Sequence, residues 1–441
     1  MIENSLYVAI QKVGGDHIKI CKVARKQEIL IQKLRFRFDD AIGQPYGLFE
    51  ASAGKLRRIC PSALNSETVE HHGFSQTDKS TLTESSCETS SADNNRNKTD
   101  GGNSSILESN SRPDLALENM QCVAEKLVKN ESMIRLSRSR QKVSQEEIHQ
   151  MKKDGLPAQH LVARLVDGNL SFPERTVYSK KKYIRRKENK HSSRLLILKP
   201  SIRLIAQSYY TKDPERIANL RLDLLSHILS LSAVHFGSRC LVFEQCAGLM
   251  SAAVIDRLGG YGACIHLHRG STAQSIPCID GMNFDSKVRS TFLPLRISTL
   301  LNGSIVEPVD DQIDPSNPEL PETAFKRRRE RLETERIAWK LFISQEIDSF
   351  IIISKDVKPI DILQYVWSSL PFASRIVVYS SISEVIIDTF NWLKSRDAIE
   401  VQIHDAFLRS HTVLPQNTRP VMQQLVVSGI IISAIKVNPE K

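Results

Sequence analysis

The segment 241–250, LVFEQCAGLM, most constrains the fold, because it combines a buried strand, a tight turn and a helix start. A strand that runs into a helix around a bound nucleotide normally carries two or three glycines, which let backbone N–H groups approach the ligand. Only Gly248 remains here. Cys246 and Met250 stand where a Glu-x-Gly-x-Gly-x-Gly loop that begins at Glu244 has its first and third glycines. Both add side chains where a ligand would lie, so the segment predicts a vestigial cofactor loop.

The residues that follow complete a strand–helix–strand unit. Residues 251–257 predict a helix, Gly259-Gly260 its C-terminal cap, and 263–267 the next strand. An acidic residue at the end of that strand would hydrogen-bond the ribose hydroxyls of a nucleoside. His268 stands there instead, and a neutral histidine offers one acceptor and no negative charge. Two elements of a cofactor site are missing, so we predict that this chain holds no cofactor.

Length and charge narrow the class of protein. The 441 residues, 41% of them apolar, suffice for two or three domains with a real core. The formal charge of +10 favours an anionic partner, nucleic acid first. Neither the eight cysteines nor the His71-His72 and His266/His268 pairs have the spacing of a metal site, so we expect reduced thiols and no metal.

Apolar runs give an expectation for the compartment. No N-terminal apolar run follows a basic start, and no apolar stretch approaches the roughly 20 residues that span a bilayer. We therefore expect a protein of the cytosol or nucleus that does not contact a membrane.

Composition divides the N-terminal part of the chain into three segments. Residues 1–60 predict a small antiparallel β domain, with strands at 6–13, 17–23 and 28–38 and a turn at Gly14-Gly15-Asp16. Residues 61–143 predict a low-complexity, largely disordered insert, because the stretch from 62 to 112 has few large apolar residues. Residues 144–175 predict a helical connector, with a Ser144-x-x-Glu147 capping box and a second helix at 157–166.

The remaining chain predicts an α/β domain in two halves, 176–301 and 323–441, separated by an acidic, proline-rich insert at 302–322. The first half contains a strand at 195–198, an amphipathic helix at 214–231 and the unit just described. The second contains a charged helix at 323–342, strands at 349–354, 375–379, 399–404 and 429–437, and a crossover helix at 383–394. Alternating strands and helices predict a doubly wound sheet, and the lack of a helix between the last two strands allows an antiparallel last strand.

Motifs spread along the whole chain match one family. They are IGQPYG at 42–47, the helices of 144–165, KPSIR at 199–203, Tyr209-Tyr210, EQCAGL at 244–249 and VLP at 413–415. In this order they resemble the non-catalytic subunits of the eukaryotic tRNA (adenine-58-N1)-methyltransferase.

The resemblance implies a class I methyltransferase-like, Rossmann-like sheet in a chain that is not itself an enzyme. It implies a tRNA-binding subunit that positions tRNA for N1-methylation of adenosine 58 in the T loop. It further implies a catalytic sister subunit that binds S-adenosylmethionine, a heterotetramer of two plus two chains, and a place in the nucleus.

The substrate side of the predicted sheet has also changed. The catalytic sister has Asp-Leu-Pro at the end of its fourth strand, and Ser354-Lys355-Asp356 stands there in this chain. Neither the acid nor the proline is in register, so we interpret Asp356 as a solvent-facing loop residue. An active S-adenosylmethionine-dependent RNA methyltransferase with a divergent cofactor loop is the alternative, and an assembly scaffold without RNA contact is a third interpretation.

Runs of cations are the candidates for RNA binding. The densest consists of Lys180, Lys181, Lys182, Arg185, Arg186 and Lys187. Its spacing would let several cations meet successive phosphates, while Tyr183 would stack on a base or anchor the segment. A nuclear-localisation signal or a solvated segment is the alternative. A second run consists of Lys326, Arg327, Arg328 and Arg329. Here Glu330, Glu333 and Glu335 could form helical ion pairs on a merely solvated face.

Further candidates lie near the N-terminus and before Tyr209. Arg35 and Arg37 alternate with Phe36 and Phe38, which places the arginines on one strand face and the aromatic rings on the other. The arginines would face RNA together with Lys55, Arg57 and Arg58, or else water. Lys199 and Arg203 flank a Pro-Ser turn and would face RNA or the partner subunit.

Overall fold

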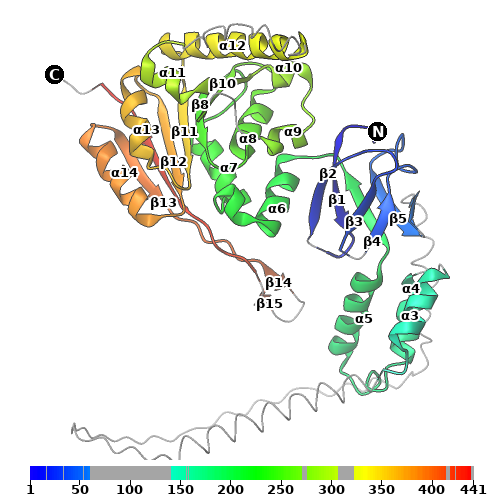
Figure 1. Cartoon of the computed structure of the whole chain (residues 1–441). Coiled ribbons are helices and arrows are strands. Elements are labelled where there is room, and N and C mark those ends of the chain that lie inside the picture. The colour runs from blue at the N-terminus through cyan, green and yellow to red at the C-terminus, as the bar shows by residue number, and fades with distance from the viewer. Residues whose placement is uncertain are drawn as a thin grey trace, which may run out of the picture. The chain divides into compact units, whose positions relative to one another are not determined.

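The computed structural model describes residues 1–15, 17–32, 34–52, 54–59, 141–154, 156, 158–270, 276–305, 322–413, 418–422 and 424–438. The chain forms two compact units: residues 1–58 with 193–441 make the first, and residues 59–192 the second (Figure 1). Nearly all of the predicted inserts at 61–143 and 302–322 lies outside the described residues. The domain boundaries drawn from composition stay predictions.

The first unit begins with a five-stranded antiparallel sheet in the order β2-β1-β7-β5-β6. Its strands are β1 Tyr7–Lys12, β2 Ile18–Lys22, β5 Gly47–Ser52, β6 Lys55–Arg58 and β7 Arg194–Leu198. We expected 195–198 to open the α/β sheet, and that was wrong: the strand pairs with β1 and β5. The reason is packing, since Leu195 and Ile197 are fully buried in the core of this small sheet together with Phe49.

A separate hairpin covers this sheet. The stretch 28–38 is two strands, β3 Glu28–Ile31 and β4 Leu34–Arg37, and not the single strand that we expected. The chain reverses at Gln32, whose φ of 52° lies in the left-handed region. The predicted alternation along β4 is confirmed: Phe36 is buried and both neighbouring arginines are exposed.

The second unit contains three helices in its described part, α3 Gln145–Lys153, α4 Ala158–Asp167 and α5 Val177–His191. The capping box that begins α3 is formed as predicted, because the side chains of Ser144 and Glu147 each accept the other residue's backbone N–H. Helix α4 buries Leu161, Val162 and Leu165. The cation-rich segment around Tyr183 forms α5, so its charges are spaced by helical geometry.

The α/β sheet has seven strands in the order β10-β9-β8-β11-β12-β16-β13. They are β8 Arg239–Glu244, β9 Ala263–His268, β10 Phe292–Arg296, β11 Ser349–Ser354, β12 Arg375–Ser380, β13 Ile399–His404 and β16 Ile430–Ile435. The first five in this spatial order are parallel, and β16 pairs antiparallel with β12 and β13. The predicted class I methyltransferase-like sheet with an antiparallel last strand is confirmed.

Helices cover both faces of this sheet (Figure 1). One face packs against α6 Ile202–Lys212, α7 Leu222–Leu231, α8 Leu249–Leu258, α9 Pro277–Gly281 and α10 Ser286–Arg289. The other packs against α11 Ile297–Asn302, α12 Glu322–Ile343, α13 Pro359–Val366 and α14 Ser383–Ser395. The continuous helix expected at 214–231 is wrong, because Ala218 and Asn219 adopt positive φ and separate a 3-10 turn, η1 Pro214–Ile217, from α7. Within the described ranges, no helix has the length and apolar character needed to cross a membrane.

An arm leaves the sheet between β13 and β16. We call residues 405–429 the arm, and its described part contains the hairpin of β14 His411–Val413 and β15 Thr418–Pro420. Figure 1 shows this hairpin extending away from the sheet. Sequence analysis did not anticipate it.

Candidate functional site

The vestigial loop joins β8 to α8, and the side chain of Glu244 occupies the backbone N–H groups at the start of α8. The carboxylate of Glu244 accepts hydrogen bonds from the backbone N–H of Met250 at 3.0 Å and of Ser251 at 2.9 Å, and from the thiol of Cys246 at 2.7 Å. Donors in the first turn of a helix are the groups that ordinarily hold an anionic ligand. In this chain they hold the chain's own carboxylate.

The two side chains that replace glycines lie in the core. Cys246 and Met250 are fully buried among the residues packed between α8 and the sheet. Gly248 keeps a left-handed conformation with φ of 80°, and a Cβ added there would lie 3.1 Å from the Cβ of Ile276. The backbone N–H of Cys278 donates to the carbonyl of Ala247 at 3.3 Å. The start of α9 therefore covers the loop.

The two histidines of β9 are buried beside this loop. The Nδ1 atom of His266 lies 2.9 Å from the hydroxyl of Ser251 and 3.7 Å from the carboxylate of Glu244. Burial lowers the pKa of His266, although Glu244 acts in the opposite direction. Burial likewise lowers the pKa of His268, whose Nδ1 lies 3.3 Å from the carbonyl of Arg269. Both pKa shifts favour the neutral form of the ring. The described residues contain no group of three or more side chains suited to a metal.

A second set of backbone donors at the same edge is occupied by Gln245. Its Oε1 atom accepts hydrogen bonds from the N–H groups of Lys355 at 2.8 Å, Asp356 at 3.0 Å and Val357 at 3.3 Å. These groups belong to the loop after β11, where the catalytic sister's substrate motif would stand. Asp356 itself is exposed, in agreement with its interpretation as a loop residue. Two adjacent side chains of one strand end thus satisfy both sets of donors.

A separate cavity of about 320 Å³ lies further along this edge. It is lined mostly by apolar side chains, among them Phe243, Ile297, Leu300 and Tyr365, with the polar groups of Arg269 and Asp361. None of the residues 244–250 lines it. Val357, whose N–H bonds Gln245, is also among the lining residues.

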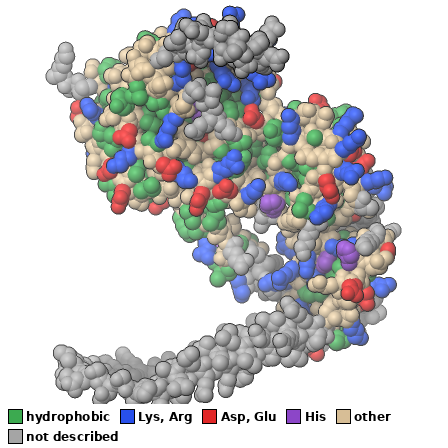
Figure 2. All heavy atoms as spheres, in the orientation of Figure 1, with side chains coloured by type: hydrophobic (Ala, Val, Ile, Leu, Met, Phe, Trp, Pro, Cys, Tyr) green, Lys and Arg blue, Asp and Glu red, His purple; other side chains and the backbone are tan. Residues whose placement is uncertain are grey.

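Helix α5 carries the densest exposed positive charge among the candidates. Lys181, Lys182, Arg185 and Arg186 are exposed and share one helix face, because residues four apart lie one above the other. Figure 2 shows lysine and arginine side chains gathered over this helix. Such a face can meet successive phosphates of an RNA backbone.

The other side of α5 is attached to α4 through Tyr183. The Tyr183 hydroxyl donates to the carbonyl of Leu165 at 3.4 Å, and its ring packs against Phe172 at 5.6 Å. The cations of Arg175 and Lys187 lie 4.8 and 5.3 Å from the same ring. Burial, and then the charges of Arg186 and Arg175, lower the pKa of Lys187. Of the two roles considered for Tyr183, the geometry supports the anchor, with Lys187 and the half-buried Lys180 on the inner side.

The basic run of α12, residues 326–329, forms fewer ion pairs with the glutamates of its helix than the sequence predicts. Lys326, Arg327 and Arg329 are exposed, whereas Arg328 is half-buried. Glu335 was expected to pair along the helix, but it is buried and accepts hydrogen bonds from Arg296 at 2.8 Å and Thr299 at 2.7 Å. Glu333 pairs with Arg336 at 3.5 Å. In the described part of the helix, no carboxylate forms an ion pair with residues 326–329.

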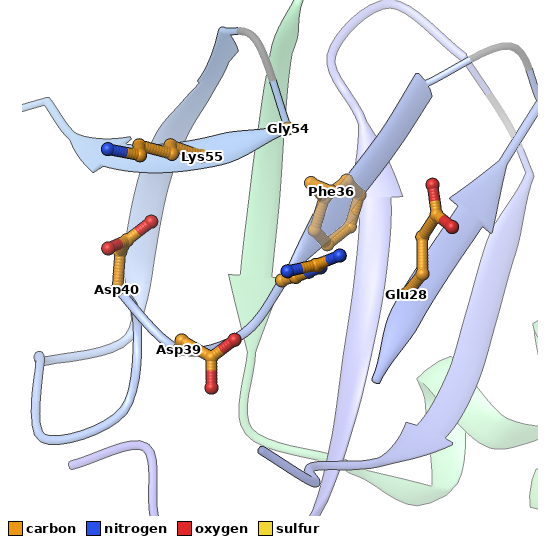
Figure 3. Close-up of a pocket in the computed structure, with 7 residues that line it drawn as sticks. Glu28, Phe36, Asp39, Asp40, Gly54 and Lys55 are labelled. Carbon is orange, nitrogen blue, oxygen red and sulfur yellow. The ribbon is translucent and has the colours of Figure 1, made fainter. Parts of the chain in front are cut away.

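The candidates of the small β domain have mixed surroundings. Arg37 lines a surface pocket of about 390 Å³ together with Lys55 and the carboxylates of Glu28, Asp39 and Asp40. Figure 3 shows these last four side chains lining the pocket. Three carboxylates against two cations disfavour a phosphate there. Of the candidate cations outside this pocket, Arg35, Arg57, Arg58, Lys199 and Arg203 are all exposed.

Comparison with known proteins identifies the family. The model of the Gcd10p family matches residues 1–330 of the 441 in the chain. The chain belongs to the Gcd10p family. Relatives of this Gcd10p-family chain include the tRNA (adenine(58)-N(1))-methyltransferase non-catalytic subunits of Dictyostelium discoideum, 28% identical, and Mus musculus, 25% identical. The matches cover 68% and 96% of this chain, and 62% and 86% of the relatives. The chain therefore spans less than two thirds of the Dictyostelium protein.

Solved structures are similar to the Gcd10p-family chain at low sequence identity. The tRNA (m1A58) methyltransferase of Aquifex aeolicus aligns over 99% of both chains with 10% identity and a TM-score of 0.44. A SAM-dependent O-methyltransferase of Thermotoga maritima aligns over 57% of this chain and 77% of its own, with 14% identity and a TM-score of 0.39.

Sequence reasoning found the altered loop of this Gcd10p-family chain but missed what fills it. Gln245 bonds residues 110 to 112 positions further along the chain, and Ile276 covers Gly248 from another element. Neither contact has a local sequence signal. The role of Glu244 as an acceptor for N–H groups at the helix start could have been suspected, because an acid close before a helix is a common cap.

Proposed function

We propose that this chain is the non-catalytic, tRNA-binding subunit of a tRNA (adenine-58-N1)-methyltransferase. It holds tRNA so that a catalytic partner chain can methylate N1 of adenosine 58 in the T loop. The names of the relatives support this, since they are non-catalytic subunits of that enzyme. The observation that carries the proposal is the filled loop, in which Glu244 and Gln245 occupy the backbone donors of a nucleotide-type site.

S-adenosylmethionine, on this proposal, is bound by the partner chain alone. A methyl donor at the usual place would need the N–H groups of the α8 start and a ribose acceptor after β9. Glu244 already takes those N–H groups, and the neutral ring of His268 replaces the carboxylate. The alternative of an active enzyme with an unusual loop has no structural feature in its favour among the described residues.

Calorimetry tests whether this chain binds S-adenosylmethionine without a partner. Purified chain without partner is titrated with S-adenosylmethionine at high protein concentration, and the catalytic subunit serves as the positive control. We expect no saturable heat from this chain and clear binding by the control. Saturable binding with one site per chain would contradict the proposal and favour the active-enzyme alternative.

tRNA recognition is proposed to rest on phosphates and folded RNA shape, because A-form grooves hide most base edges from side chains. The exposed face of α5 is proposed as the main contact. Further contacts are proposed separately at the basic run of α12 and at Arg35, Arg57, Arg58, Lys199 and Arg203. These assignments rest on the exposure of the side chains and on their positive charge.

The partner surface is proposed to be the arm. Seven large apolar side chains are exposed on its described residues, and Phe407 at 78%, Val413 at 76% and Met422 at 85% are the most exposed. Several exposed apolar side chains on one segment are typical of a protein interface and unfavourable for RNA binding. We further propose two copies of each chain in the assembly and a nuclear location. Light scattering on the purified complex, and imaging of the tagged chain, test these two points.

A further inference from the structure

A buried arginine lies at the base of the arm. Arg221 is only 4% exposed and immediately precedes α7. Its guanidinium donates to both carboxylate oxygens of Asp223, at 3.0 and 2.8 Å. It also donates to the carbonyl of Ala406 at 2.6 Å and to the carbonyl of Val426 at 3.1 Å. One side chain therefore bonds both the segment that leads into the arm, at Ala406, and the segment that returns from it, at Val426.

Tyr210 holds the returning strand from a second helix. Its hydroxyl donates to the carbonyl of Val427 at 2.6 Å and lies 3.5 Å from that of Leu425. Tyr210 belongs to α6, whereas Arg221 precedes α7. Together, the two residues attach the arm to two helices on one face of the sheet.

The arm needs such an attachment because few hydrogen bonds within its described part hold it in one conformation. β14 and β15 pair only with each other among the described strands, and an isolated two-stranded hairpin is marginally stable in water. Along the rest of the arm, the carbonyl of Ser410 accepts a hydrogen bond from the N–H of Val421, and the N–H of Ser410 donates to the Oε1 atom of Gln424. The direction in which the arm leaves the domain therefore depends on the bonds at its base.

We propose that Arg221 and Tyr210 are positioning residues for subunit association, which preorganise the arm so that its apolar side chains meet the catalytic partner in one orientation. This rests on the proposed function, because the partner is the one named there. Preorganisation increases affinity because less conformational freedom is lost on binding. Loosening the base should weaken assembly while the interface side chains stay unchanged.

Tyr210→Phe tests the inference with the neighbouring Tyr209→Phe as matched control. Tyr210→Phe removes only the hydroxyl that bonds the arm. Tyr209 has its ring 5.6 Å from the Arg216 cation, and no hydrogen bond of its hydroxyl is found among the described residues. Both variants are measured for deuterium uptake in peptides of the arm in the free full-length chain, and for affinity to the purified catalytic subunit by surface plasmon resonance.

For Tyr210→Phe we expect higher deuterium uptake in residues 405–429 and an affinity for the catalytic subunit lower by about 3- to 10-fold, as for the loss of one hydrogen bond. Tyr209→Phe should change neither quantity. Arg221→Lys keeps the charge but loses the forked donor geometry, so it should have the larger effect. If that variant fails to fold, Tyr210→Phe alone decides.

Equal affinities of the two tyrosine variants and the unaltered chain would overturn the inference. Weaker binding without increased uptake would also overturn it, because the hydroxyl would then act on the partner and not through the arm. If the unaltered chain fails to bind the catalytic subunit, the proposed function fails instead, and uptake in the free chain still tests the attachment of the arm.

Discussion

At the scale of single residues, Glu244 fixes the turn between β8 and α8. The carboxylate bonds two backbone N–H groups at the start of α8 and the thiol of Cys246, and the ring of His266 lies beside it. Burial raises the pKa of Cys246 far above its ordinary value, with the neighbouring Glu244 acting in the same direction. The thiol therefore stays protonated and acts as a donor, which fits a structural thiol in place of a glycine.

His266 gives this network a pH dependence. Because its pKa is lowered in the folded chain, the unfolded chain takes up a proton first as the pH falls below about 6.5. Stability is therefore present above this pH and is lost as the pH falls toward the folded-state pKa. We expect the loss to reach at most about 1.4 kcal/mol per pH unit from this residue.

Urea denaturation at pH 7.5 and 5.5 measures the effect. His266→Gln should reduce the difference in unfolding free energy between the two pH values, while His160→Gln on the exposed side of α4 should leave it as in the unaltered chain. An equal difference for all three proteins would show that another group carries the pH dependence.

At the scale of elements, one side of α5 packs against α4 and the opposite side carries exposed cations. Its inner side holds Tyr183 against α4, and its outer face presents four cations in two rows. The helix can therefore lose its outer charges without losing its packing. The same separation does not hold for Arg37, which shares its pocket with three carboxylates.

Neutralising the outer face tests the RNA contact. Changing Lys181, Lys182, Arg185 and Arg186 to Gln in the assembled complex should weaken tRNA binding. It should also reduce the slope of log affinity against log salt by about 3, because each lost phosphate contact removes about 0.7 to 0.9. Filter binding over a range of salt concentrations measures both quantities.

A control with the same change of net charge replaces the exposed Lys212, Lys340, Lys394 and Arg396 by Gln. It should leave the salt slope close to that of the unaltered complex. If both quadruple variants reduce the salt slope equally, the effect is due to net charge. The α5 run would then be a solvated segment or a nuclear-localisation signal.

At the scale of the whole molecule, the spatial order of the strands brings together segments that are far apart in the chain. β8 lies between β9 and β11, so the loop at 244–250 meets both His268 and the loop at 355–357 at one sheet edge. The backbone N–H groups at this edge are therefore occupied by side chains from β8 and the residue after it, and not by one local contact. The arm begins at the carboxyl end of β13 and exposes seven large apolar side chains in its described part.

Restoring the lost cofactor residues should therefore not restore function. The triple variant Cys246→Gly, Met250→Gly and His268→Glu still has Gln245 on the loop after β11 and Ile276 over Gly248. We expect no transfer of a tritiated methyl group to tRNA by the variant alone. We also expect destabilisation by several kcal/mol, because two buried side chains are removed from the core. Methylation by this variant would show that the acceptor side is intact.

Local patterns predicted much of the fold. The capping box at Ser144, the run 349–354 buried on both faces, the charged helix near 323–342 and the antiparallel last strand all follow from side-chain periodicity and turn chemistry. The errors arose where a local pattern fits two partners. Residues 194–198 suit either sheet as a strand, and only the packing of Leu195 and Ile197 beside Phe49 assigns them to the small one.

The sequence by itself determined that this chain carries a nucleotide-type strand and turn without its glycines, because a lost glycine is a local change in backbone freedom. It also placed the positive charge in short runs. Only the tertiary structure decided that Gln245 fills the donors of residues 355–357, that Glu335 bonds Arg296 of another element, and that Arg221 bonds both ends of the arm. These contacts join residues up to 205 positions apart, and such pairs are set by the order of strands in a folded sheet.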